Sequence, residues 1–160
     1  MTSDKSYSTE QRLGSLVSTL GSLSKTASAV PQTISSTGAT AITGCTMAVA
    51  AAKYVFRARV TFKGGTAAGT ANFSVTGPSN TGPWISALFI MSSGVAGIGA
   101  QDAALGPVSS PVLTTADSVA DIEGEVTFTA AGTIALACAE GTNLDTVIIQ
   151  QAHFWVWQMQ

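Results

Sequence analysis

The stretch YVFRARVTFK, residues 54–63, alternates between an apolar and a mostly polar side chain. Successive side chains of a β-strand point to opposite faces, so this period of two predicts a strand. The face that carries Tyr54 and Phe62 belongs to the core, and the face that carries Arg57, Arg59 and Lys63 lies outside it.

Other stretches predict strands of the same kind, separated by turn signals of Gly, Pro and Asn. Residues 48–53 have helical propensity but are too few for a crossover helix, so we expect a turn there. About eight short antiparallel strands without a long helix predict an all-β fold, which we interpret as an antiparallel β-sandwich of the jelly-roll type. The further strands are expected at 33–42, 73–76, 84–92, 112–119, 121–130, 133–139 and 146–158.

The N-terminal segment has a different period. Four leucines follow one another at spacings of three, four and three, which is typical of one stripe of an associating helix over residues 8–24. About two heptads are too short to be stable alone, so we expect the helix to order on assembly. A helix lying on the β domain and a disordered tail are the alternatives. We therefore divide the chain into an anchoring or oligomerisation segment, 1–31, and a β-sandwich domain, 32–160. The leucines are Leu13, Leu16, Leu20 and Leu23.

Charge and composition limit the function. Only 10% of the 160 residues are charged and the net charge is −2, which gives no basic footprint for nucleic acid. A weakly charged surface suits a subunit of a large assembly, where neighbours cover it. No signal peptide or membrane span is evident, so we expect assembly in the cytoplasm. We interpret Cys45 and Cys138 as buried thiols, with a disulfide as the alternative.

Two regions point to a subunit interface. The loop 94–111 is long and apolar, and we expect it to pack on a neighbour. In the last strand Phe154, Trp155 and Trp157 place large apolar groups on both faces. One face meets the core, so the other is expected to meet a loop, the N-terminal helix or a second copy, for which a trimer axis is suitable.

Three carboxylates occupy alternate positions of one expected strand, about 7 Å apart on one face. Like charges so placed need compensation, and the basic face of the strand at 54–63 offers three cations. Ion pairing across a sheet or a subunit boundary, solvation, and a calcium or magnesium site are all open, although a metal needs more ligands than one strand supplies. The carboxylates are Asp121, Glu123 and Glu125, and the cations are Arg57, Arg59 and Lys63.

Little in the sequence suggests catalysis. His153 is the only histidine and lies in the most apolar expected strand, so a Ser-His-Asp relay is not indicated. The glycines at 94–99 lack the spacing and the lysine of a phosphate loop. We expect no catalytic residue and no cofactor, and we interpret the protein as not an enzyme.

Three segments resemble virion proteins of tailed bacteriophages, especially those that infect actinobacteria. They are ISSTGATAITGCTMAVAAAKYVFRARVTF (34–62), VTGP (75–78) and DIEGEVTFTAAGTIALACAEG (121–141). The resemblance covers most of residues 32–157 and extends to head decoration proteins, capsid fibres and minor tail proteins. It implies a trimeric β-sandwich on a virion surface and carries over no catalytic residue.

The sequence therefore suggests a non-enzymatic structural protein of a phage virion. We expect a homotrimer that decorates the capsid, binds the major capsid protein and stabilises the head, with neither nucleic acid nor membrane as partner. The alternative is a receptor- or glycan-binding domain of a minor tail protein. In that case a host surface glycan would contact Trp84 and the loop 94–111.

Overall fold

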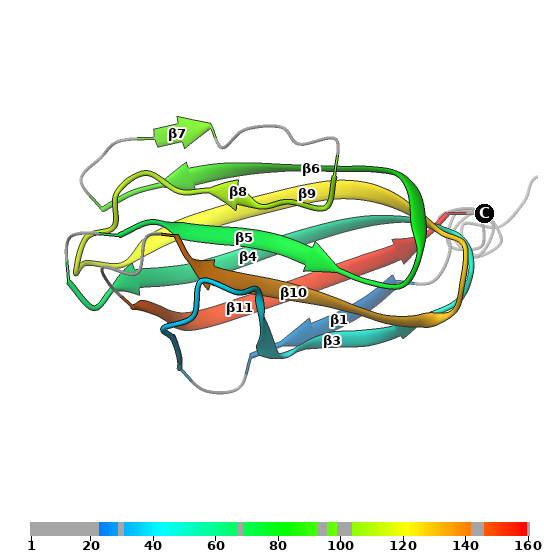
Figure 1. Ribbon diagram of the computed structural model, residues 1–160, viewed down its shortest axis with the longest axis horizontal. Helices are drawn as coiled ribbons and strands as arrows, with labels where there is room; N and C mark the ends of the chain where they lie inside the picture. Colours follow the sequence, from blue (N-terminus) through cyan, green and yellow to red (C-terminus); the bar gives the residue numbers. More distant parts are fainter. Residues whose placement is uncertain are drawn as a thin grey trace, which may run out of the picture.

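The computed structural model describes residues 23–28, 31–66, 69–92, 96–98, 104–141 and 146–159, with the backbone alone at 23–25 and 96–98. These residues form eleven strands in two antiparallel sheets and contain no helix. The two sheets lie in layers, with β3, β10 and β5 in front of β11, β4 and β9 in Figure 1. The expectation of an all-β fold with antiparallel sheets is confirmed.

The larger sheet has seven strands in the order β1-β11-β4-β9-β6-β7, and β2 pairs with β11 beyond the end of β1. The smaller sheet has the order β3-β10-β5-β8. The strands of the larger sheet are β1 (Leu23–Ala27), β2 (Gln32–Ile34), β4 (Lys53–Gly64), β6 (Asn80–Ile90), β7 (Ala96–Ile98), β9 (Ser118–Phe128) and β11 (Val147–Gln158). Those of the smaller sheet are β3 (Thr40–Val49), β5 (Ala71–Thr76), β8 (Val108–Ser109) and β10 (Gly132–Glu140).

The pairing is nested along the chain. β2 pairs with β11, β3 with β10, β4 with β9 and β5 with β8, all antiparallel. The hairpin of β6 and β7 is inserted between β5 and β8, and it extends the larger sheet beyond β9. As a result, most neighbours in each sheet are far apart in sequence.

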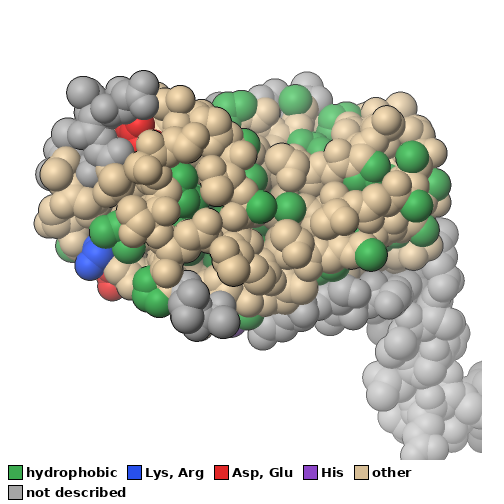
Figure 2. Space-filling model, turned by 60° about the horizontal axis from the view of Figure 1, so that its bottom comes forward, with side chains coloured by type: hydrophobic (Ala, Val, Ile, Leu, Met, Phe, Trp, Pro, Cys, Tyr) green, Lys and Arg blue, Asp and Glu red, His purple; other side chains and the backbone are tan. Residues whose placement is uncertain are grey.

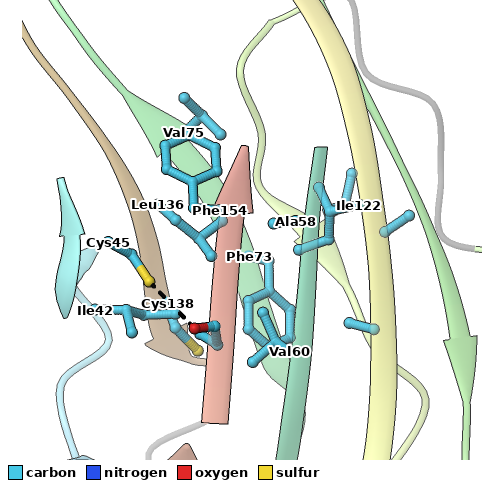
Figure 3. Packing of buried hydrophobic residues seen from close by; sticks show 14 of the residues in the cluster. Ile42, Cys45, Ala58, Val60, Phe73, Val75, Ile122, Leu136, Cys138 and Phe154 are labelled. Carbon is cyan, nitrogen blue, oxygen red and sulfur yellow. Dashed lines mark hydrogen bonds between the residues drawn. The ribbon is translucent and has the colours of Figure 1, made fainter. Parts of the chain in front are cut away.

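The core lies between the sheets and is rich in aromatic rings. The ring of Phe62 contacts those of Phe73 and Phe89, with centroids 5.1 and 6.3 Å away. Such tilted and edge-on pairs add to the free energy gained from apolar burial. Figure 3 shows part of this core, including the two thiols of the smaller sheet. Cys45 and Cys138 are buried and free, as one of the two alternatives expected.

β4 shows the alternation predicted for residues 54–63. Its inward side chains Tyr54, Phe56, Ala58, Val60 and Phe62 are at most 5% exposed. The alternate positions are exposed or half-buried. One strand therefore carries both a wall of the core and the basic row outside it.

Two expected strands are wrong in extent. The stretch 33–42 contains the end of β2, a bend at 37–38 and the start of β3, so it crosses from one sheet to the other. The stretch 112–119 is mostly irregular, and β9 begins only at Ser118. In both cases the chain changes layers, and hydrophobic periodicity does not mark such a corner.

The last residues of the helix expected over 8–24 are a strand, because Leu23 and Ser24 belong to β1. β1 pairs antiparallel with β11, from Leu23 opposite Trp157 to Ala27 opposite His153. A helix end leaves carbonyl groups without partners, whereas this ladder satisfies the backbone. Leu13, Leu16 and Leu20 lie outside the described residues. The sheet also begins before the expected domain boundary at residue 31.

β1 closes one edge of the sandwich against β3 (Figure 1). At the contact, Gly44 has φ +84°, and a Cβ there would meet the Ala27 carbonyl oxygen at 2.5 Å. Only glycine combines this backbone conformation with so close an approach. Gly44 thus brings the two layers together at this edge.

Only the inner face of β11 is fully buried within the chain, and cover of its outer face by a second copy stays a prediction. Val147, Ile149, Ala152, Phe154 and Val156 are fully buried on the inner face. On the outer face His153, Trp155 and Trp157 are only half-buried.

Candidate functional site

The outer face of the larger sheet collects most of the residues that the sequence singled out. The register of β11, β4, β9 and β6 aligns them in three cross-strand rows. Along these strands the rows are Trp157–Val55–Glu125–Trp84, Trp155–Arg57–Glu123–Ser86 and His153–Arg59–Asp121–Leu88.

The two charged sets meet because β4 and β9 are neighbours. Arg59 Nε lies 4.0 Å from Asp121 Oδ1, which is the outer limit of an ion pair. The short ion pair joins Lys53 Nζ to Glu125 Oε1 at 2.8 Å. Lys63, an expected member, lies beyond the last residue that β4 pairs with β9 and is opposite Ile148 of β11. Lys53 was missed because it comes one residue before the recognised alternation.

Arg57 is opposite Glu123 in the register, yet no ion pair or hydrogen bond joins the Arg57 side chain to any described residue. Both Arg57 and Arg59 are exposed on the outer face. A guanidinium has five N–H donors in one plane and remains charged at any pH that a protein tolerates. These two side chains therefore present hydrogen-bond donors to whatever occupies the surface beside them.

An open groove of about 410 Å³ lies beside these arginines, lined by Arg57, Arg59, Asp121, Trp155 and Trp157. The lining comes from three strands, β4, β9 and β11. The indole rings form the apolar part, and two cations with one carboxylate form the polar part. Each side chain was singled out by the sequence, but not their combination, because the order of strands in the sheet brings them together.

A smaller hollow of about 200 Å³ lies on the other side of Arg57 and Asp121. Its lining includes Ser86, Leu88 and Glu123. Leu88 and its neighbour on this face, Ile90, are 41% and 46% exposed. The β6 side of the face therefore also exposes large apolar side chains.

Two buried polar atoms in one cross-strand row lack a hydrogen-bond partner. They are Asp121 Oδ1 and His153 Nδ1, on either side of Arg59. The ring of His153 packs near that of Trp155, with centroids 5.6 Å apart. A buried polar atom without a partner costs about 1–3 kcal/mol, so this row gains most from a ligand or a water that supplies hydrogen bonds.

The carboxyl groups described on this face do not have the arrangement that glycoside hydrolysis uses. Glycoside hydrolysis needs two carboxyl groups on opposite sides of the scissile bond, and the groove is lined by one, Asp121. Asp121, Glu123 and Glu125 lie at alternate positions on the outer face of β9. The described residues contain no group of three His, Cys, Asp or Glu side chains placed to hold a metal ion.

The two thiols are buried and far from this face. Burial raises the pKa of Cys45 to about 11 and that of Cys138 to about 12. Cys45 Sγ lies 3.9 Å from the Ala152 carbonyl oxygen, as the dashed line in Figure 3 marks. A thiol with such a pKa remains protonated at neutral pH and is a poor nucleophile or metal ligand.

The other expected contact residues have different positions. Phe154, expected at an interface, is in the core, with its ring 6.3 Å from that of Phe56, because it occupies an inward position of β11. Trp84 is half-buried on the outer face, and two strands, β4 and β9, separate it from Trp157. In the loop 94–111, Leu105 packs against the core.

Among the described residues, no helix has the length and apolar character needed to cross a membrane. Comparison of the chain with protein-family models, with curated proteins and with solved structures gives no match.

Proposed function

We propose that the protein is a non-enzymatic structural subunit of a phage virion, a trimeric sandwich of the jelly-roll type that decorates the capsid. In a jelly roll a long antiparallel ribbon is rolled up, so the first strand pairs with the eighth, the second with the seventh, and so on inward. The nested pairs β2–β11, β3–β10, β4–β9 and β5–β8 support this assignment.

The observation that carries the assembly role is the outer surface. β3, β5 and β8 contain no charged residue, and the only one in β10, Glu140, is buried. Figure 2 shows few charged side chains, gathered at one end of the visible face. A weakly charged surface gives a free monomer little protection against association and suits a subunit covered by neighbours.

Leu88 and Ile90 are the best contacts for a second copy, because they are large, apolar and exposed next to each other on one face. They replace Phe154 as the proposed interface residues, because Phe154 is buried in the core. In this proposal the segment 1–31, which contains β1 at the sheet edge, attaches the trimer to the major capsid protein in the virion.

Two measurements test the proposal. Light scattering should give a mass three times the 16.2 kDa of the chain, and Leu88→Asp should lower it. The trimer should then co-sediment with purified phage heads, and deletion of residues 1–22, which ends before β1, should abolish this. A monomer at micromolar concentration, or virion density at the tail tip alone, would contradict the decoration role.

A receptor- or glycan-binding domain is the second candidate. One observation favours it, namely the groove in which Trp155 and Trp157 lie next to Arg57 and Arg59.

A further inference from the structure

We propose that the groove formed by β4, β9 and β11 is a carbohydrate-binding site that prefers acidic sugars. Pyranose rings stack on Trp155 and Trp157, and Arg57 and Arg59 bind hydroxyl and carboxylate groups. The site goes beyond capsid decoration and uses other parts of the chain than segment 1–31 and Leu88, so either proposal can fail alone.

The tryptophans form the stacking platform. Trp155 and Trp157 are two residues apart on the outer face of β11, which places their Cα atoms about 7 Å apart and puts both indole rings in one groove. Both are half-buried, so their surroundings fix the rings while part of each stays accessible. The face of an indole is electron-rich and attracts the weakly positive C–H bonds on the flat face of a sugar.

The polar groups complement this platform. Neither the Arg57 nor the Arg59 side chain makes a hydrogen bond to the described residues, and Asp121 Oδ1 also has no hydrogen-bond partner. A sugar carries hydroxyl groups that both donate and accept, so it can satisfy the guanidinium donors and the carboxylate acceptor together. Arginine also binds a carboxylate through two parallel N–H···O bonds.

The volume and the charge of the groove limit the class of ligand that it can bind. The groove of about 410 Å³ is within the range of about 300–1,000 Å³ for small-ligand sites, and its open form admits a chain longer than one ring. Two cations and one carboxylate line it, which favours a sugar that carries a carboxylate over a neutral one. Tryptophan and arginine also bind single-stranded nucleic acid, but such binding uses a basic groove that follows several successive phosphates, and only two cations line this one.

The test uses the full chain and two probes, the hexamer of galacturonic acid and the hexamer of glucose, followed by tryptophan fluorescence and calorimetry. We expect the acidic hexamer to bind at least tenfold more tightly, a difference of about 1.4 kcal/mol. Trp155→Ala and Trp157→Ala should each lower the affinity for both probes at least tenfold. Arg57→Gln should weaken the acidic hexamer about tenfold and the neutral one little, which a purely structural role does not predict.

Trp84→Ala is the matched control, since Trp84 lies on the same face but outside the groove. It should leave binding unchanged. Trp155→Phe keeps an aromatic face and should retain most of the affinity, which separates stacking from misfolding.

Three results would overturn the proposal. They are no binding of either hexamer at millimolar concentration, binding that survives Trp155→Ala and Trp157→Ala, and a loss of self-association in these two variants without any glycan binding by the wild type. The last result would identify the groove as a contact between copies. If binding occurs but the trimer does not attach to phage heads, only the decoration role is wrong.

Discussion

The outer faces of the two sheets differ, although both belong to strands that alternate between core and surface. The face of the smaller sheet consists of small, neutral side chains, such as Ala135, Ala137 and Ala139 of β10, which are at most 6% exposed. On the larger sheet, Arg57, Trp155 and their neighbours stand up from the strands and leave hollows between them.

The comparison teaches that the chemistry of the lining, and not the presence of a hollow alone, separates the two faces. The smaller sheet also has a hollow, of about 380 Å³, but short neutral side chains such as Asn72, Ser74 and Ala139 line it. Long side chains on neighbouring strands make walls, and a groove forms where an aromatic strand lies beside a charged one. The smaller sheet suits close covering by another surface, and the larger sheet suits recognition.

The largest expected effect comes from a substitution in the core, against which the strands of both faces pack. Phe62 packs against Phe73 of the smaller sheet and Phe89 of the larger one. Phe62→Ala should lower the free energy of unfolding by about 3–5 kcal/mol, because it leaves a cavity between the layers. Urea unfolding measures the change, and Phe62→Leu should cost clearly less. Equal losses for the two variants would show that the packing there is not specific.

A substitution beneath the larger sheet should have the next largest effect. A Cβ on Gly124 of β9 would overlap the ring of Phe56 and the carbonyl oxygen of Trp84. Gly124→Ala should therefore cost about 1–3 kcal/mol through overpacking, measured by thermal unfolding. Gly38→Ala is the control, since a Cβ there would meet Ser36 Oγ at an ordinary 3.4 Å. The prediction is contradicted if both variants unfold alike.

Alkaline pH should lower the stability of the protein through the buried thiols of the smaller sheet. The smaller sheet buries Cys45 and Cys138, and burial raises their pKa values from 9.0 to about 11 and about 12. The folded state holds these protons more tightly than the unfolded chain, so stability is complete below pH 9.0 and falls as pH rises toward 11 and 12.

The double variant Cys45→Ala and Cys138→Ala isolates this contribution. Its stability between pH 8 and 11 should fall less steeply than that of the wild type, as chemical unfolding at each pH measures. Parallel curves would mean that the thiols do not contribute, because lysine and tyrosine titrate in both proteins.

The smallest expected effect is on the exposed ion pair of the larger sheet. Lys53→Ala removes the 2.8 Å contact with Glu125 and should cost at most about 1 kcal/mol, since water screens the pair. The cost should disappear at high salt, which screens exposed charges further. Thr46→Ala on the neutral face should show no salt dependence. A cost for Lys53→Ala that persists at 1 M salt would indicate packing by the lysine stem instead.

The success of the sequence analysis depended on how far apart the interacting residues are along the chain. β4 and β9 were recognisable from their own alternation, and so was the placement of Arg57 and Asp121 on outward faces. The irregular segments between layers were not, because a corner has no period. Phe154 was misplaced because a run of large apolar residues does not indicate which of them points inward.

The sequence by itself determined the all-β class, the strand at 54–63 and the residues of the charged and aromatic rows, because each depends on alternation within one strand. Only the tertiary structure decided that β11, β4 and β9 lie side by side in this register. Nested pairing joins residues as distant in sequence as Gln32 and Ile149. It does so through backbone hydrogen bonds that every sequence can make and a core that many pairings can fill. The groove therefore belongs to the fold, although each residue that lines it was visible in the chain.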